Sequence, residues 1–214
     1  LDEAMNVSDM STIKKEAPNR LDLRDEVIFT IDGADTKDID DAISINKTSE
    51  GYELGVHIAD VSYYVKPKSE LDNEAIRRGT SVYYANRVIP MLPKELSNGI
   101  CSLNPQEDRL AFSALMKIDF EGALTDYKFA KTIIRSRVKG VYSEINTILA
   151  ETQKPEIDEK YKEVKASLKL MDELAKILKR NKKLRGAPEL ETSESKLIIN
   201  DDDFCVDVIP RSRG

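Results

Sequence analysis

The sequence predicts an α+β protein in which a mixed β-sheet is packed against helices. Segments of strand-type composition gather between residues 27 and 134. From Tyr142 onward, the apolar residues change to the three- and four-residue spacing of helices. The two kinds of segment do not alternate regularly, as they would in a parallel α/β sheet. A chain of 214 residues, 40% of them hydrophobic, is long enough to bury a substantial core.

The predicted strands are short runs rich in β-branched and aromatic residues and bounded by turn residues. They are residues 27–31, 42–45, 52–58, 110–118, 124–134, 196–200 and 204–209. A turn around Gly51 joins the second run to the third, so we expect a hairpin there. Glu121-Gly122 and the acidic stretch 201–203 supply similar turns for the later pairs.

Two helices stand out, and the first residues of the chain look irregular. Ser69 is a candidate N-cap and Gly79 a candidate stop for a short helix between them. The spacing of apolar residues predicts a longer helix over 159–184. Its apolar stripe consists of Tyr161, Val164, Leu168, Met171, Leu174 and Leu178. Residues 1–19 show no such period, and we interpret them as an interdomain linker.

Composition excludes several classes of protein. No run of about 18 apolar residues exists, so no transmembrane helix and no membrane partner are expected. Residues 1–4 lack the features of a signal peptide. Cys101 and Cys205 are too few and too distant for a disulfide framework or a zinc knuckle, which favours a cytoplasmic setting. His57 is the only histidine, so His-rich metal sites are excluded.

Basic residues are concentrated in the second half of the chain. Residues 128–185 contain 16 Lys and Arg against 8 Asp and Glu, although the whole chain has a formal net charge of −6. Such a segment can bind nucleic acid locally. A solvated basic helix face explains the same pattern, and the sequence leaves both readings open.

The most informative stretch runs from Thr30 to Ile43 and holds five aspartates within ten positions. They are Asp32, Asp35, Asp38, Asp40 and Asp41. Like charges about 4 Å apart repel by roughly 1–4 kcal/mol, depending on the local dielectric, so a loop that gathers them needs a counter-charge. Hard divalent cations prefer carboxylate oxygens, which indicates Mg²⁺, with Mn²⁺ as a substitute. Metals held this way suit phosphodiester hydrolysis.

Other readings of this stretch are weaker. A solvated acidic loop remains the plain alternative. A calcium EF-hand fails on spacing, since Ala34, Lys37 or Ile39 occupies the ligand positions in either register. The chain has no glycine-rich phosphate-binding motif, so no nucleotide cofactor is expected. His57 lacks the surroundings of a catalytic triad and is expected to be structural or hydrogen-bonding.

Several short segments follow one another in order over residues 20–214. They are 30–33 (TIDG), 37–42 (KDIDDA), 56–62 (VHIADVS), 78–83 (RGTSVY), 89–93 (IPMLP), 96–105 (LSNGICSLNP), 108–110 (DRL) and 211–213 (RSR). With these segments the chain resembles the RNB catalytic domain of the ribonuclease II/ribonuclease R family, and their details favour its bacterial ribonuclease R branch. The resemblance implies a processive, metal-dependent 3′-to-5′ exoribonuclease that hydrolyses single-stranded RNA to nucleoside 5′-monophosphates.

The resemblance also assigns roles to the acidic residues. Asp32, Asp38, Asp40 and Asp41 match the family's four catalytic, metal-binding aspartates, whereas Asp35 lies outside that set. Asp40 matches the position whose loss abolishes cleavage but spares RNA binding.

Two tyrosines match RNA-binding positions of the family. Tyr83 matches an aromatic residue that orients the 3′-terminal nucleotide, and Tyr142 one that stacks on terminal bases. Stacking of this kind contributes roughly 1–3 kcal/mol per base. The sequence departs from the family at Tyr63, where a histidine is expected.

By this resemblance, residues 1–19 are the interdomain linker and residues 20–214 the N-terminal portion of a partial RNB-type catalytic domain. The family carries further RNA-binding domains and downstream active-site residues, so we expect the isolated 214 residues to be weakly active or inactive. Two alternatives stay open: a fragment that binds RNA or metal without turnover, and a purely structural fragment.

Overall fold

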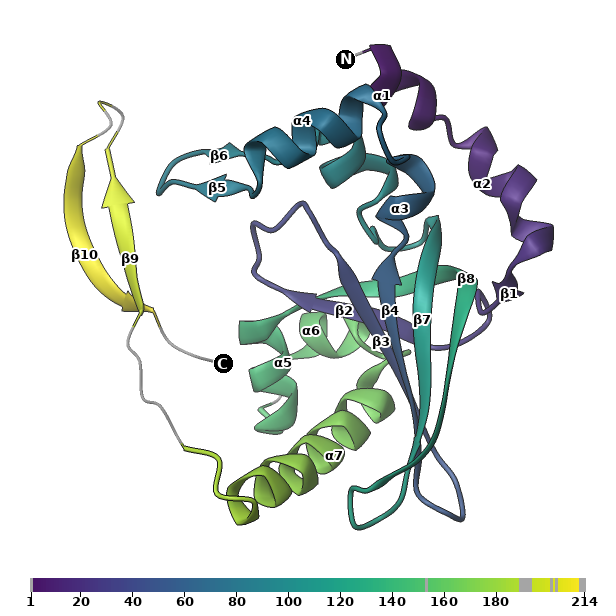
Figure 1. Cartoon of the computed structure of the whole chain (residues 1–214). Coiled ribbons are helices and arrows are strands. Elements are labelled where there is room, and N and C mark those ends of the chain that lie inside the picture. Colours follow the sequence, from purple (N-terminus) through teal and green to yellow (C-terminus); the bar gives the residue numbers. More distant parts are fainter. Residues whose placement is uncertain (1, 153, 189–193, 201, 203, 212–214) are drawn as a thin grey trace.

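The computed structural model describes residues 2–152, 154–188, 194–200, 202 and 204–211. In this part of the chain, a mixed six-stranded sheet has the spatial order β1-β8-β2-β3-β4-β7 (Figure 1). Its strands are β1 (Leu21–Asp22), β2 (Ile28–Asp32), β3 (Asp41–Lys47), β4 (Tyr52–Ala59), β7 (Asp108–Ile118) and β8 (Leu124–Val141). Only β1 and β2 run parallel to β8, and the other pairs of this sheet are antiparallel. The α+β prediction is confirmed.

Strand β8 closes the sheet on itself. Its first part pairs antiparallel with β7, from Leu124 opposite Ile118 to Arg135 opposite Asp108. Its last part pairs parallel with β2 and ends with Val141 opposite Asp32. Because β2, β3, β4 and β7 are also paired in sequence, β8 completes a ring of strands. The sequence predicts this strand only as far as residue 134.

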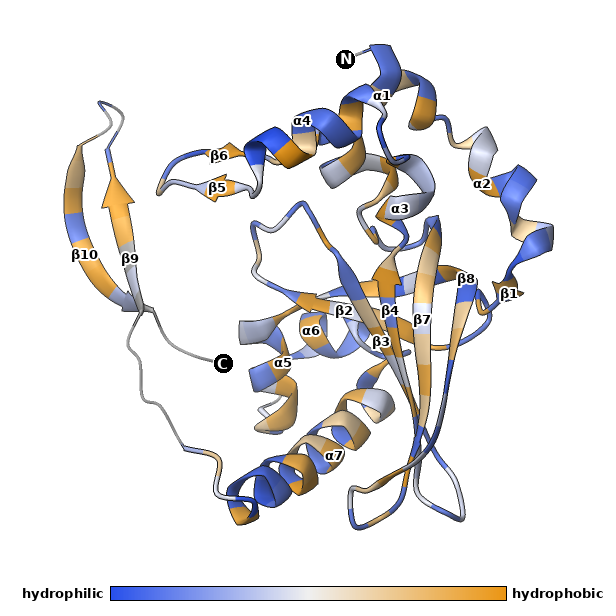
Figure 2. Cartoon of the chain, viewed as in Figure 1, coloured by the Kyte–Doolittle hydropathy of each residue, from blue (hydrophilic) through white to orange (hydrophobic). Residues whose placement is uncertain are grey.

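Helices pack on two sides of this ring (Figure 1). They are α1 (Asp2–Val7), α2 (Ser11–Glu16), α3 (Val61–Tyr64), α4 (Glu70–Arg78), α5 (Tyr142–Leu149), α6 (Pro155–Lys160) and α7 (Lys165–Leu184). Residues of α5 to α7 bury Phe29 and Val138 in one apolar cluster. A second cluster joins α1, α2 and α4 to Ile28 and Ile39. Figure 2 shows the apolar stripe of α7 turned toward the strands.

The helix expected over 159–184 is interrupted. The chain leaves the helix after Lys160 and starts a new one at Lys165. Between them, Tyr161 turns fully inward; its hydroxyl donates to Glu144 at 2.6 Å and accepts from the backbone N–H of Val141 at 2.9 Å. These contacts with α5 and with the end of β8 override the helical period.

The expectation of an irregular segment over residues 1–19 is wrong for its local structure. The residues form α1, α2 and a 3₁₀ turn at Ala17–Asn19. Ala4 and Ile13 are buried in the core, and Glu3 accepts a hydrogen bond from the backbone N–H of Leu71 at 3.0 Å. Helices this short show little periodic spacing of apolar residues in the sequence, because tertiary contacts rather than local propensity stabilise them. Their role as an interdomain linker stays a prediction.

The remaining short elements were predicted in part. Ser69 caps α4 by accepting from the backbone N–H of Asp72 at 3.1 Å, and Gly79 ends the helix with a φ of 73°. The last two predicted strands form the hairpin β9 (Glu194–Ile199) and β10 (Cys205–Arg211). The hairpin of β5 (Val82–Tyr83) and β6 (Val88–Ile89) and the π-type helical turn Glu95–Ile100 were not predicted. No helix among the described residues is long and apolar enough to cross a membrane.

Candidate active site

The acidic stretch forms the connection from β2 to β3. Asp32 is the last residue of β2 and Asp41 is the first residue of β3, so the sheet holds both ends of the loop. Asp38 and Asp40 lie in the loop itself. Asp35 is exposed, and no role is assigned to it.

The middle of this loop is anchored in the core by Ile39, which is 1% exposed. The hydroxyl of Ser102 donates to the carbonyl of Lys37 at 2.8 Å and accepts from the N–H of Ile39 at 3.1 Å. The N–H of Leu103 donates to the carbonyl of Ile39 at 2.9 Å. Asp38 and Asp40 flank Ile39, so these bonds fix the backbone that carries both carboxylates.

Lys139 of β8 holds the other side of the loop. Its Nζ donates to the carbonyl oxygens of Ala34, at 2.9 Å, and Thr36, at 2.6 Å. Its charge also lowers the pKa of Asp32, against the stronger effects that raise it. Sequence reasoning assigned no role to Lys139 or Ser102. Each lies more than 60 positions from its partners, and no local pattern connects such residues.

The electrostatics of the acids fit a bound cation. Burial, followed by the charge of Asp41, raises the pKa of Asp32. Burial, then Asp38, then Asp41 raise the pKa of Asp40. Oδ2 of Asp32 is buried without a hydrogen-bond partner. An orphaned buried carboxylate oxygen among like charges is costly unless a cation reaches it.

The aspartates are close enough to repel one another, but their side chains do not converge on a common point where a metal ion could be coordinated. Among the described residues, no group of three His, Cys, Asp or Glu side chains is arranged to hold a metal ion. The donor set is nonetheless all carboxylate oxygen, which suits Mg²⁺ or Mn²⁺.

The two tyrosines lie differently with respect to the acids. The hydroxyl of Tyr83, on β5, donates to Oδ2 of Asp38 at 2.6 Å, and this bond raises the pKa of Tyr83. Tyr83 as a whole is 64% exposed, so it is accessible to a ligand. Tyr142 is 53% exposed and follows Val141, the residue opposite Asp32. The structure thus places both tyrosines beside the acidic loop.

His57 lies away from this site and joins three strands. Its Nε2 is 3.0 Å from the hydroxyl of Ser44 on β3, and its Nδ1 is 2.7 Å from the hydroxyl of Ser113 on β7. Burial lowers its pKa to about 4, so the ring is neutral at pH 7. This matches the structural role expected from the sequence.

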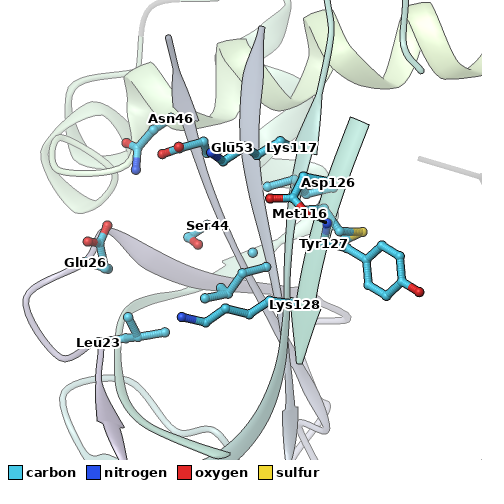
Figure 3. A pocket seen from close by; sticks show the side chains of 13 residues that line it. Leu23, Glu26, Ser44, Asn46, Glu53, Met116, Lys117, Asp126, Tyr127 and Lys128 are labelled. Atoms are coloured by element: carbon cyan, nitrogen blue, oxygen red, sulfur yellow. Dashed lines mark hydrogen bonds between the residues drawn. The ribbon is translucent and has the colours of Figure 1, made fainter. Parts of the chain in front are cut away.

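A cavity of about 280 Å³ opens inside the ring of strands near His57 (Figure 3). Ser44 lines it together with acidic and basic side chains, including Glu26 and Lys128. Tyr127 points away from it in Figure 3. None of the four candidate aspartates lines this cavity, so it is separate from the acidic loop.

Comparison with known proteins agrees with this geometry. Residues 20–213 match the family model described as RNB domain. The chain is 47% identical to ribonuclease R of Thermotoga maritima over 203 residues, covering 94% of this chain and 28% of that protein. It is 43% identical to ribonuclease R of Escherichia coli over 194 residues, covering 88% of this chain and 24% of that protein. The chain thus spans only about a quarter of the length of these relatives.

Solved structures show the same fold. The RNase R of Mycoplasma genitalium in complex with double-stranded RNA has a TM-score of 0.86 and 31% identity. That comparison covers 95% of this chain and 35% of the other. The same protein in complex with ribose methylated single-stranded RNA has a TM-score of 0.86 and 30% identity, covering 96% of this chain and 31% of the other.

Proposed function

Because the chain belongs to the RNB-domain family of ribonucleases, we propose that it supplies the catalytic acids of a metal-dependent exoribonuclease. This enzyme would processively hydrolyse single-stranded RNA from its 3′ end to nucleoside 5′-monophosphates, in the cytoplasm. The observation that carries the proposal is the loop between β2 and β3. It holds four aspartates between two strand ends, and Ser102 and Lys139 fix its backbone.

Asp32, Asp38, Asp40 and Asp41 are the residues that would hold Mg²⁺, or Mn²⁺ in its place. The metal would activate a water molecule and neutralise charge on the scissile phosphate. The Oδ2 of Asp32 supports this assignment, since it is buried and no hydrogen-bond donor among the described residues reaches it.

The protein's own groups would orient the substrate around these acids. The Tyr83 hydroxyl is bonded to Asp38, so its exposed ring would align a terminal nucleotide beside the acids. Tyr142 offers a second exposed ring for stacking at the end of β8. Lys139 would keep the loop in place while a phosphate approaches.

A second candidate is a chain that binds RNA or metal without turnover. It is favoured by one observation, that no three metal-binding side chains converge among the described residues. The chain also spans only 24–28% of the two relatives above, so the activity proposed here belongs to the longer protein of which such a chain would be a part.

The two candidates are separated by a time course on 5′-labelled single-stranded RNA with Mg²⁺, run for the longer protein and for the 214-residue chain. Release of mononucleotides, with labelled RNA shortening from its 3′ end and no reaction in EDTA, supports the exoribonuclease. Binding without products from either protein supports the second candidate. Endonucleolytic fragments would contradict both.

A further inference from the structure

A second cavity, of about 670 Å³, adjoins the acidic loop. One wall is the loop itself, residues 34–38, with Lys139 behind it. The opposite wall is the turn between β5 and β6. Lys94, which precedes the π-type helical turn, and Asn98 within that turn also line the cavity. Figure 1 shows the β5–β6 hairpin extending above the loop that follows β2.

The cavity is lined by more basic than acidic side chains. Lys37, Arg87, Lys94 and Lys139 line it, together with only two acidic residues, Asp35 and Asp38. Lys139 is occupied by the loop carbonyls, but the other three basic side chains form no ion pair within the described part of the chain.

The lack of ion pairs distinguishes these cations from much of the basic segment 128–185. At least half of the 16 basic residues in that segment already bind carboxylates or backbone carbonyls. These eight are Arg135, Arg137, Lys139, Lys160, Lys162, Lys165, Lys169 and Lys176. Internal partners of this kind compete with an external anion. Among the described residues, Arg87 and Lys94 have no such competitor in an ion pair.

Arg87 is also held in a defined orientation. Its guanidinium carbon lies 5.2 Å from the centre of the Tyr84 ring, within the range of a cation–π contact. A guanidinium presents several donors in one plane, which matches the oxygens of a phosphate group. Because stacking on Tyr84 already restricts the Arg87 side chain, less conformational entropy would be lost when it binds a phosphate.

We propose that this cavity binds a phosphate group of the nucleic acid, with Arg87 and Lys94 as its direct ligands. This inference rests on the proposed function for the identity of the anion. Of the four candidate aspartates, only Asp38 lines the cavity, so the bound phosphate would be a neighbour of the reacting one rather than the reacting one itself. The cavity would thus hold either a phosphodiester of the strand or the phosphate of a released nucleotide.

The test is RNA binding without metal, so that hydrolysis does not interfere. A fluorescent single-stranded oligoribonucleotide is titrated in EDTA at several salt concentrations. The double variant Arg87→Gln, Lys94→Gln should lower the slope of log affinity against log salt by about 1.4, since each phosphate contact on a single strand contributes about 0.7. The matched control is Lys179→Gln, Arg180→Gln on α7, which should leave the slope unchanged.

The source of the phosphate is determined by a second titration with uridine 5′-monophosphate. If the double variant has a lower affinity for both the oligonucleotide and uridine 5′-monophosphate, the cavity binds a nucleotide phosphate. If its affinity falls for the oligonucleotide alone, the cavity binds a phosphodiester of the strand. An unchanged salt slope in the double variant overturns the proposal, as does an equal loss in the control. If the slope falls as expected but the longer protein releases no mononucleotides, the proposed function fails and the phosphate site stands.

Discussion

The Nζ of Lys139 lies 2.6 Å from the carbonyl oxygen of Thr36, in the middle of the acidic loop. The two residues are 103 positions apart in the sequence, and the parallel pairing of β2 with β8 brings them together. This bond and the Ser102 bonds on the other side hold the loop from two directions.

Replacing Lys139 by Met should lower kcat of the longer protein about 10- to 100-fold and change KM for RNA little. Hydrogen bonds from a charged group contribute about 1.5–3 kcal/mol, and their loss lets the loop move. Lys139→Arg, which restores a cation at this position, should recover part of the rate. Lys154→Met is the control. A parallel fall in kcat and thermal stability, without recovery by Arg, would make Lys139 a general structural residue.

Replacing Asp40 by Asn should lower hydrolysis by orders of magnitude and leave RNA affinity near wild type, since phosphate contacts come chiefly from basic residues. The substitution keeps the size of the side chain and removes its charge. Asp35→Asn is the matched control, because Asp35 lies in the same loop but outside the catalytic set. Comparable turnover by the two variants would remove Asp40 from that set.

Replacing Arg20 by Met should destabilise the fold by about 3–5 kcal/mol, as expected when one partner of a buried ion pair is removed. Its guanidinium lies 2.7 Å from the Asp60 carboxylate, with side chains 0% and 4% exposed. Burial acts to raise the pKa of Asp60, but hydrogen bonds from Arg20 and Ser62 outweigh it and lower that pKa. Urea unfolding measures the loss.

The control for Arg20 is Lys162→Met. Lys162 forms an exposed ion pair with Glu159, in which the side chains are 62% and 74% exposed. Exposed pairs contribute little to stability, so the unfolding midpoint should stay in place. Equal effects of the two substitutions would contradict the assignment of a buried pair.

His57 should make stability depend on acid pH. Its pKa is about 4 in the folded chain, against an ordinary value of 6.5. Between these values the unfolded chain binds more protons, so stability should fall as the pH drops from about 6.5 toward 4, by up to about 1.4 kcal/mol per pH unit. Above pH 6.5 the ring is neutral in both the folded and the unfolded chain, so this loss of stability is absent. His57→Gln should remove this part of the slope in urea unfolding at several pH values.

Much of the fold follows from local sequence. The runs at 27–31, 42–45 and 52–58 became β2, β3 and β4, since their turns and composition agree with the final pairing. The acidic loop was also correctly placed between two strands. What local patterns could not show is the closure by β8, because its partners β1 and β2 lie about a hundred residues earlier.

The sequence predicted the aspartates and tyrosines of the candidate site, but not the residues that hold its loop in place. Five closely spaced aspartates form a visible pattern, and the family resemblance singled out four of them together with Tyr83 and Tyr142. Lys139 and Ser102 are ordinary residues in their own segments, and only the tertiary fold gives them a role. Arg87 and Lys94 were missed because a single exposed cation carries no signal of the cavity that it lines.

The parallel pairing of Asp32 with Val141 has a consequence for biosynthesis. A ribosome adds about 5–20 residues per second, so roughly 5–20 s pass between the two residues leaving the peptidyl transferase centre. Throughout that interval the nascent chain carries its aspartates without β8 and without the lysine that holds their loop. The acidic loop therefore gains its final support late in synthesis, only when the strand ending at Val141 pairs with β2.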